Sequence, residues 1–191
     1  LIENELRVAR MSGCNTQEFR PKPPKKNNTD NDYSLVRPLY GRHIKKSLLN
    51  DLRITRRGDS VNMSMLFLAD RDIIKSLVNA NKRGVRMNLI LDKNIISFNK
   101  KKIGFSNRFV AEELRKKGVI VRWANTVKEE FHSKMVYIFL KRNESGIIHL
   151  GSANLSKKSL SATNLENNIR IKFGKSKLMD DIDQYFRIVS K

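Results

Sequence analysis

The sequence is short of cysteine and of long apolar runs, and each shortage removes a class of protein. Its 191 residues contain one cysteine, Cys14, so an internal disulfide framework is excluded. No histidine or second cysteine stands near Cys14 at metal-ligand spacing, so this residue gives no sign of a zinc site. No apolar run approaches the roughly 20 residues of a membrane-spanning helix, and no basic-then-apolar signal segment opens the chain.

Acidic residues are also few compared with basic ones. Asp and Glu number 19 against 39 Lys and Arg, which gives a formal net charge of +20 at pH 7 with neutral histidines. Such an excess raises the local concentration of phosphate-bearing partners, and nucleic acid and anionic membrane surfaces both qualify. Most basic clusters are solvated surface, and the run from Lys100 to Lys102 is expected to be such a loop. Charge alone therefore identifies no substrate.

The first part of the chain is poor in core-forming residues. From Asn15 to Asp32 it is polar and contains proline, so it cannot bury enough apolar surface to fold alone. We predict that residues 1–40 are a linker or the remnant of an upstream half, largely irregular, and that residues 41–191 form one domain. The chain begins at Leu1 rather than at methionine, which is typical of the middle of a longer product and leaves its localisation open.

Beyond residue 40, helical and strand patterns alternate. The periodicity predicts helices at 44–54, 70–82, 107–117 and 177–189, strands at 61–68, 85–91, 119–123 and 168–173, and a hairpin of 135–140 with 147–150. Gly84 follows the second helix, where a residue without Cβ can turn the chain into the next strand. The pattern predicts an α/β fold in which a mixed β-sheet is flanked by helices.

Two short polar motifs flank the predicted hairpin. Phe131-His132-Ser133-Lys134 leads into its first arm, and Gly151-Ser152-Ala153-Asn154 follows its second arm. Because alternate residues of an extended chain share a face, we expect His132 with Lys134, and Ser152 with Asn154, to point the same way from adjacent strands. Gly151 is expected to let the backbone approach a ligand closely.

The two motifs together supply one set of chemical groups. His132 is a nucleophile or proton carrier, Lys134 is a fixed cation, and Ser152 and Asn154 are neutral hydrogen-bonding groups. This set suits a phosphate diester, whose charge shifts during displacement. Downstream, Glu166 supplies a carboxylate that could hold the imidazole of His132 in one tautomer and stabilise its charged form.

At these residues the sequence resembles the phospholipase D superfamily, whose motif is His-x-Lys, four residues, Asp, and then Gly-Ser-x-Asn. The resemblance is closest to the C-terminal half of bacterial proteins with two such motifs, and covers roughly residues 41–191. Three further segments resemble that family: Leu89-Ile90-Leu91-Asp92, Asn107-Arg108-Phe109-Val110-Ala111 and Ile120-Val121-Arg122-Trp123.

The resemblance implies a phosphodiesterase, either a hydrolase or a phosphatidyl transferase, that needs no metal or other cofactor. By this resemblance His132 is the nucleophile that forms a phosphohistidine, and Glu166 orients it. Lys134 and Asn154 bind phosphate, assisted by Ser152.

The chain departs from the family motif at one position, because Phe139 stands where the motif has Asp. That Asp is not the family's nucleophile, so the departure affects the completeness of the motif more than the chemistry. The family site also needs two histidines, whereas this chain has one near-complete set. The resemblance therefore implies one phospholipase-D-like half, completed by upstream sequence or by a second copy in a homodimer.

Other candidate residues have plainer interpretations. His43-Ile44-Lys45 repeats the His-x-Lys spelling within a predicted helix, where residues two apart do not share a face, so His43 is expected at the surface. His149 shares the strand parity of Gly151, which allows a role beside the site, but an ordinary core histidine is the favoured interpretation. Asp70, Arg71 and Asp72 are typical of a helix start rather than a metal site.

Two functions remain in competition at this level. The first is a phosphodiesterase acting on phospholipid or nucleic acid. The alternative is a degenerate half-site that holds polyanions, such as nucleic acid or an anionic membrane, without turnover, for which Phe139 and the +20 charge are the supporting features. The enzyme hypothesis also explains Glu166, and a purely structural role would leave the Gly-Ser-Ala-Asn motif unexplained.

Overall fold

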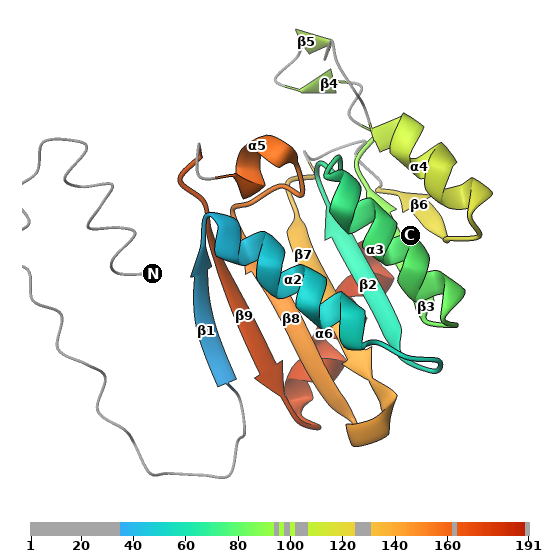
Figure 1. The fold of residues 1–191 in the computed structure, drawn as a ribbon, viewed down its shortest axis with the longest axis vertical. Helices are drawn as coiled ribbons and strands as arrows, with labels where there is room; N and C mark the ends of the chain where they lie inside the picture. Colours follow the sequence, from blue (N-terminus) through green and yellow to red (C-terminus); the bar gives the residue numbers. More distant parts are fainter. Residues whose placement is uncertain are drawn as a thin grey trace, which may run out of the picture.

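The computed structural model describes residues 35–93, 96–97, 100–101, 107–124, 131–161 and 164–189. Cys14 and the polar run of 15–32 lie outside the described residues. The strands are β1 (Leu35–Tyr40), β2 (Ser60–Met65), β3 (Arg86–Leu91), β4 (Ile96–Ser97), β5 (Lys100–Lys101), β6 (Val121–Trp123), β7 (Lys134–Leu140), β8 (Ser145–Gly151) and β9 (Asn167–Phe173). The helices are α2 (Arg42–Ile54), α3 (Arg71–Lys82), α4 (Asn107–Lys116), α5 (Lys157–Leu160) and α6 (Lys177–Val189), with a 3₁₀ turn at Lys141–Asn143 (Figure 1).

Seven strands form one mixed sheet in the order β1-β9-β8-β7-β2-β3-β6. β3 is parallel to both of its neighbours, β2 and β6. All other neighbouring pairs in this sheet are antiparallel. Parallel neighbours need crossover connections, and α3 and α4 supply them. The predicted α/β fold with a mixed sheet is confirmed. Two of the residues predicted as a basic loop, Lys100–Lys101, instead form strand β5, which pairs with β4 apart from this sheet.

Helices cover both faces of the sheet: α2 and α3 lie over one face, and α6 lies over the other (Figure 1). Val136 and Ile138 of β7 belong to the core beneath α2 and α3. Tyr137, between them, packs with Ile182 and Phe186 of α6. Strand alternation therefore assigns the even-numbered residues of β7, which include the predicted site residue Lys134, to the α2–α3 face.

The start and the end of α3 follow the predicted signals. The carboxylate of Asp70 accepts hydrogen bonds from the backbone N–H groups of Asp72 (3.1 Å) and Ile73 (3.2 Å), which confirms it as the N-cap. Lys45 of α2 forms salt bridges with Asp70 (2.8 Å) and Asp72 (2.6 Å) and so ties the two helices together. Gly84 follows the helix with a φ of +84°, in the left-handed conformation that was predicted.

Strand β1 lies before the boundary predicted at residue 40. It forms the edge of the sheet, paired antiparallel with β9. Of its six residues only Leu39 is buried, so the strand lacks the apolar alternation by which strands are found in a sequence. Pro38, which has no N–H to donate, is tolerated because the strand is at an edge. The sheet therefore takes in residues 35–40.

Candidate functional site

The two motifs meet at one edge of the sheet. Lys134 is the first residue of β7 and pairs with Met65 of β2, while Gly151 is the last residue of β8 and pairs with Asn168 of β9. Since Met135 pairs with Leu150, the start of β7 lies beside the end of β8. The predicted hairpin is thus confirmed, and it brings both motifs to the upper edge of the sheet in Figure 1.

Strand alternation was expected to align four side chains: His132, Lys134, Ser152 and Asn154. This expectation is wrong for all of them except Lys134. Only Lys134 lies within a strand, whereas His132, Ser152 and Asn154 lie in the segments that precede β7 and follow β8. Their positions are set instead by hydrogen bonds from these segments to neighbouring parts of the fold.

The ammonium group of Lys134 lies against His132. Lys134 Nζ is 3.1 Å from Nδ1 and 3.3 Å from Nε2 of the imidazole, and it donates to the His132 carbonyl oxygen at 3.0 Å. An ammonium group can only donate, so a ring nitrogen that bonds to it must be unprotonated. Lys134 is 8% exposed, whereas His132 is exposed. The arrangement presents an accessible imidazole with a lone pair, next to a largely buried positive charge.

Ser133, between these two residues, anchors the segment to the opposite face of the sheet. Its Oγ lies 2.5 Å from Ser64 Oγ of β2 and 2.8 Å from Tyr185 Oη of α6, and Ser64 and Tyr185 also bond to each other at 2.7 Å. The Ser133 carbonyl oxygen accepts from the Leu66 N–H at 2.8 Å. These bonds fix the backbone on which His132 is mounted.

The Gly-Ser-Ala-Asn loop is held from two sides. On one side, the Ser152 N–H donates to the Asn167 carbonyl oxygen at 3.0 Å, and the Ala153 N–H donates to Asn168 Oδ1 at 3.2 Å. On the other side, the Leu155 N–H donates to the Phe67 carbonyl oxygen at 3.0 Å, in the segment between β2 and α3. Ser152 and Asn154 therefore project from a short backbone segment that is fixed at both ends.

Gly151 is required by the neighbouring strand. A Cβ on this residue would overlap the Asn167 carbonyl oxygen and lie 2.6 Å from the Cα of Asn168. Strand β9 thus approaches β8 at a distance that any larger residue prevents. The expected close approach exists, but its partner is β9.

The side chain of Asn154 forms no hydrogen bond within the described part of the chain, and its Oδ1 is buried there without a partner. A buried polar atom left unpaired costs about 1–3 kcal/mol. The Nδ2 group, which can donate to a bound phosphate, likewise has no hydrogen-bond partner among the described residues.

Glu166 lies beside Ser152. Ser152 Oγ donates to Glu166 Oε2 at 2.5 Å, and Asn164 Nδ2 donates to Glu166 Oε1 at 3.4 Å. Among the described residues no hydrogen bond joins Glu166 to His132. The carboxylate thus fixes the hydroxyl group of Ser152, and its predicted contact with the imidazole is not made in this conformation.

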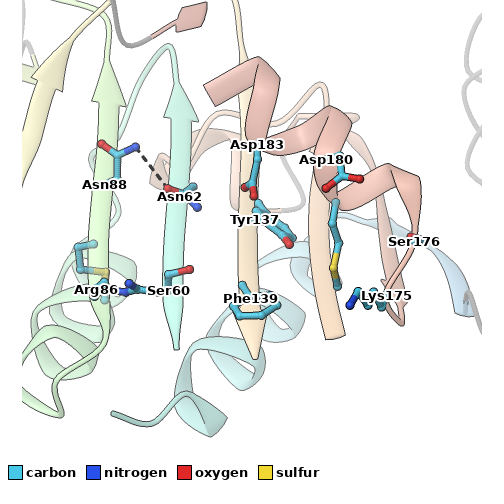
Figure 2. Close-up of a pocket in the computed structure, with 12 residues that line it drawn as sticks. Ser60, Asn62, Arg86, Asn88, Tyr137, Phe139, Lys175, Ser176, Asp180 and Asp183 are labelled. Carbon is cyan, nitrogen blue, oxygen red and sulfur yellow. Dashed lines mark hydrogen bonds between the residues drawn. The ribbon is translucent and has the colours of Figure 1, made fainter. Parts of the chain in front are cut away.

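Phe139, at the position of the motif Asp, faces away from the site. It is five residues beyond Lys134, so strand alternation places it on the opposite face of the sheet. There it lines a hollow of about 660 Å³ beneath α6, together with Tyr137 and Lys175 (Figure 2). Replacement of Asp by Phe at this position therefore takes no side chain away from His132.

A buried asparagine that the sequence did not single out for a role joins the loops behind the site. Asn107, at the start of α4, is fully buried. Its Oδ1 accepts from the Leu68 N–H at 2.9 Å, and its Nδ2 donates to the carbonyl oxygens of Leu66 (2.9 Å) and Asp92 (2.8 Å). It thus connects the ends of β2 and β3 to α4.

His149 belongs to a buried charge network. Its Nε2 lies 2.7 Å from Asp51 Oδ2, and Arg170 contacts both carboxylate oxygens of Asp51, at 2.7 and 2.9 Å. His149 is 3% exposed, so the favoured interpretation as a core histidine is confirmed. Burial raises the pKa of Asp51, but the hydrogen bonds and charges of His149 and Arg170 outweigh burial and hold this pKa below its ordinary value of 3.8. In the sequence, the signal for this network was Asp51 itself, a carboxylate on the apolar face of α2.

The remaining expectations concern metal ions, membranes and the second His-x-Lys. Within the described ranges, no group of three or more His, Cys, Asp or Glu residues is arranged to hold a metal ion. None of the helices in those ranges is both long enough and apolar enough to cross a membrane. His43 is exposed, as predicted, and its ring lies 5.3 Å from that of Tyr40.

Comparison with known proteins gives one family and one fold. The family model described as "Cardiolipin synthase, PLD-like domain" matches residues 51–189. No curated protein sequence matches the chain significantly.

The solved structures that are similar to this chain include the following three. Nuc from Salmonella typhimurium, a phospholipase D family member, is 20% identical, with a TM-score of 0.64 over 82% of this chain and 93% of that chain. NucT from Helicobacter pylori is 18% identical, with a TM-score of 0.62 over 82% and 95%. Phosphatidylserine synthase from Haemophilus influenzae Rd KW20 is 13% identical, with a TM-score of 0.64 over 100% of this chain and 45% of that chain.

At these identities the structural matches establish a shared fold. The family model covers most of the chain and includes both polar motifs. The chain therefore belongs to the phospholipase D superfamily.

Proposed function

We propose that this chain carries half of a phosphodiesterase site that acts through a phosphohistidine at His132. Superfamily membership supports phosphodiesterase or phosphotransferase chemistry. The observation that carries the proposal is the pairing of the exposed His132 imidazole with the largely buried Lys134 ammonium group. This pairing places a nucleophile next to a cation that can bind the phosphate oxygens.

The reaction has two steps. An unprotonated ring nitrogen of His132 attacks phosphorus, the bond from phosphorus to the leaving oxygen breaks, and the leaving oxygen takes up a proton. Water then attacks the phosphorus of the phosphohistidine and loses a proton, the bond from phosphorus to the His132 nitrogen breaks, and His132 returns to its starting form. Transfer to an alcohol instead of water follows the same path.

The other residues act on the phosphate. Lys134 turns from the imidazole to the phosphate oxygens, while the side-chain NH2 group of Asn154 donates hydrogen bonds to them. The Ser152 hydroxyl group has a single proton, which it donates to Glu166 in this structure, so it donates to the phosphate only after it turns away from Glu166. Glu166 contributes through Ser152, whose hydroxyl group it holds at 2.5 Å. Orientation of His132 by Glu166 would require the carboxylate to change its position.

One imidazole cannot attack phosphorus and protonate the leaving oxygen in the same step, so the leaving oxygen needs a second acid. We propose that a second His-x-Lys motif supplies it, either from a second copy of this chain or from upstream sequence. The first source fits the similarity to Nuc and NucT, because this chain covers 93% and 95% of their lengths and so corresponds to nearly the whole of each protein.

A covalent intermediate tests the proposed nucleophile. Intact protein is mixed with bis(p-nitrophenyl) phosphate in a buffer that contains EDTA, quenched at alkaline pH and examined by peptide mass spectrometry. We expect phosphorylation of His132, because the site offers an imidazole and an ammonium group rather than a set of metal ligands. A phosphorylated residue elsewhere, or a reaction that stops with EDTA and returns with a divalent ion, would count against the mechanism.

Separation by size tests the half-site. We expect an isolated monomer of this chain to be folded and nearly inactive, and a dimer to turn over substrate, because only the dimer has two imidazoles at one phosphate. Fractions are assayed directly after their mass is measured by light scattering. Full turnover by a fraction that is monomeric throughout the assay would contradict the two-histidine scheme.

Binding of polyanions without turnover is the second candidate function, favoured by the net charge of +20. Its other support is weakened, because Phe139 lies on the face of the sheet away from His132. We prefer the enzyme because a binding module needs neither the exposed imidazole nor the free Asn154 amide.

A further inference from the structure

Residues of α2 and of the β1 edge of the sheet, which Figure 1 locates, line a second concave surface, and we call it the edge groove. Its volume is about 460 Å³, and five basic residues line it: Arg37, His43, Lys46, Arg170 and Lys172. The groove belongs to the face of the sheet that carries Lys134, but the proposed chemistry uses none of its side chains.

The positive charge of the edge groove is not balanced within the protein. Arg37 of β1 is paired directly with Arg170 of β9, and like charges at such positions repel. Asp51 is the one carboxylate in the lining, and it is already bound to Arg170 and His149. Among the described residues, Arg37, Lys46 and Lys172 form no ion pair. A ligand with several negative charges would relieve this repulsion.

The basic surface continues beyond the groove. A neighbouring hollow of about 630 Å³ shares Lys172 and is lined by Arg56, Arg57, Lys141 and Arg142. Its carboxylate, Asp59, is bound to the backbone N–H groups of Arg56 (2.8 Å) and Lys141 (2.9 Å).

The length of this surface exceeds that of a single phosphate group. The basic lining residues of the edge groove on β9, Arg170 and Lys172, are two residue steps apart, roughly 7 Å, and the neighbouring hollow extends the surface to Lys141 and Arg142. The two hollows together therefore present basic residues to more than one phosphate of a nucleic-acid chain. A lone lipid phosphate would occupy only part of it.

The groove begins close to the candidate site. Tyr40 of β1 pairs with Asn167 of β9, and the backbone of Asn167 bonds to Ser152. Two strand spacings, roughly 10 Å, therefore separate Ser152 from Tyr40, which follows Leu39 of the groove lining in the chain. Here the exposed rings of Tyr40 and His43 lie 5.3 Å apart. Exposed rings next to a basic groove are a platform on which unpaired bases stack.

We propose that the edge groove binds the backbone of a single-stranded nucleic acid whose scissile phosphodiester lies at His132. The inference rests on the proposed function for the site itself and names the substrate class. The basic residues contact successive phosphates, and the Tyr40–His43 pair stacks on a base next to the cleaved bond.

The hollow on the opposite face provides a matched control. Arg86 and Lys175 line it together with Asp180 and Asp183, so positive and negative charges are mixed there (Figure 2). Like Arg37 and Lys172 in the groove, Arg86 and Lys175 are exposed. The double variants Arg37→Gln/Lys172→Gln and Arg86→Gln/Lys175→Gln therefore lose the same net charge from equally exposed positions.

The experiment measures binding of a fluorescent oligothymidylate to the full chain by anisotropy at several salt concentrations. The groove variant should bind on the order of tenfold more weakly, and its log–log salt slope should be smaller by about 1.4, because two phosphate contacts to a single strand are lost. The control variant should stay within about twofold of wild type. Equal losses in both variants, or no loss in the groove variant, would overturn the inference.

Two further measurements separate the alternatives. Vesicles containing phosphatidylglycerol should bind both variants equally, and a selective loss with the groove variant on vesicles but not on oligothymidylate would assign the groove to lipid instead. Hydrolysis of bis(p-nitrophenyl) phosphate by the wild type reports on the proposed function independently. If the wild type is active and the groove variant binds normally, the inference fails while the function stands.

Discussion

Replacement of His132 by alanine is expected to lower phosphodiester turnover by roughly 10⁴-fold or more, while polyanion affinity stays within about twofold of wild type. The imidazole forms the covalent bond, so its loss removes the reaction path. The long-range attraction comes from the many Lys and Arg residues, which the substitution leaves in place. Turnover of bis(p-nitrophenyl) phosphate and binding of oligothymidylate are measured on the same preparation.

Turnover by Glu166→Gln is to be compared with turnover by His132→Ala. Glutamine retains an oxygen that accepts from the Ser152 hydroxyl group, but it lacks the negative charge, so we expect a milder loss, on the order of tenfold. Asp180→Asn, on the opposite face, controls for the change in net charge, because it also removes one negative charge from an exposed position. If His132→Ala turned over substrate as fast as the wild type, the site would be wrongly assigned. The basic surface would then be the better account of the chain.

The sequence predicted those parts of the fold that depend on local patterns. Asp70 and Gly84 mark the start and end of α3 because a capping carboxylate and a left-handed turn are both properties of neighbouring residues. The hairpin was found for the same reason, since its arms are apolar and close in sequence. Strand β1 was missed because it is an edge strand, in which only Leu39 is buried.

The candidate site shows the same division. His132 and Lys134 do lie within hydrogen-bonding distance, as their closeness in sequence allows, but His132 precedes β7 and strand alternation does not set its position. The contact of Glu166 with Ser152 depends on how β8 meets β9, and Asn107 acts on segments 15 to 41 residues away. No local periodicity reports on such contacts, so sequence alone could supply the residues of the site but not all of their partners.

The buried network around Asp51 leads to the largest expected effect on stability. Asp51 links α2 to β8 and β9, its side chain is 8% exposed, and it bonds to both His149 and Arg170. Removing one member of a buried ion pair typically costs about 3–5 kcal/mol, because the partner charge is left without compensation. We expect Asp51→Asn to lower the free energy of unfolding by about this amount at pH 7, as measured by urea denaturation.

The pH dependence of this effect distinguishes the charge of Asp51 from its packing. The pKa of Asp51 in the folded chain lies below its ordinary value of 3.8, so the ionised form favours folding above about pH 4, and this contribution is lost as the pH falls through the lower folded pKa. The difference between wild type and Asp51→Asn should therefore shrink below pH 4. Asp72→Asn is the control, because Asp72 forms its salt bridge with Lys45 at an exposed position and should matter little at any pH. Equal destabilisation by the two substitutions, or a difference for Asp51→Asn that persists in acid, would show that the Asp51 charge does not hold α2 to the sheet.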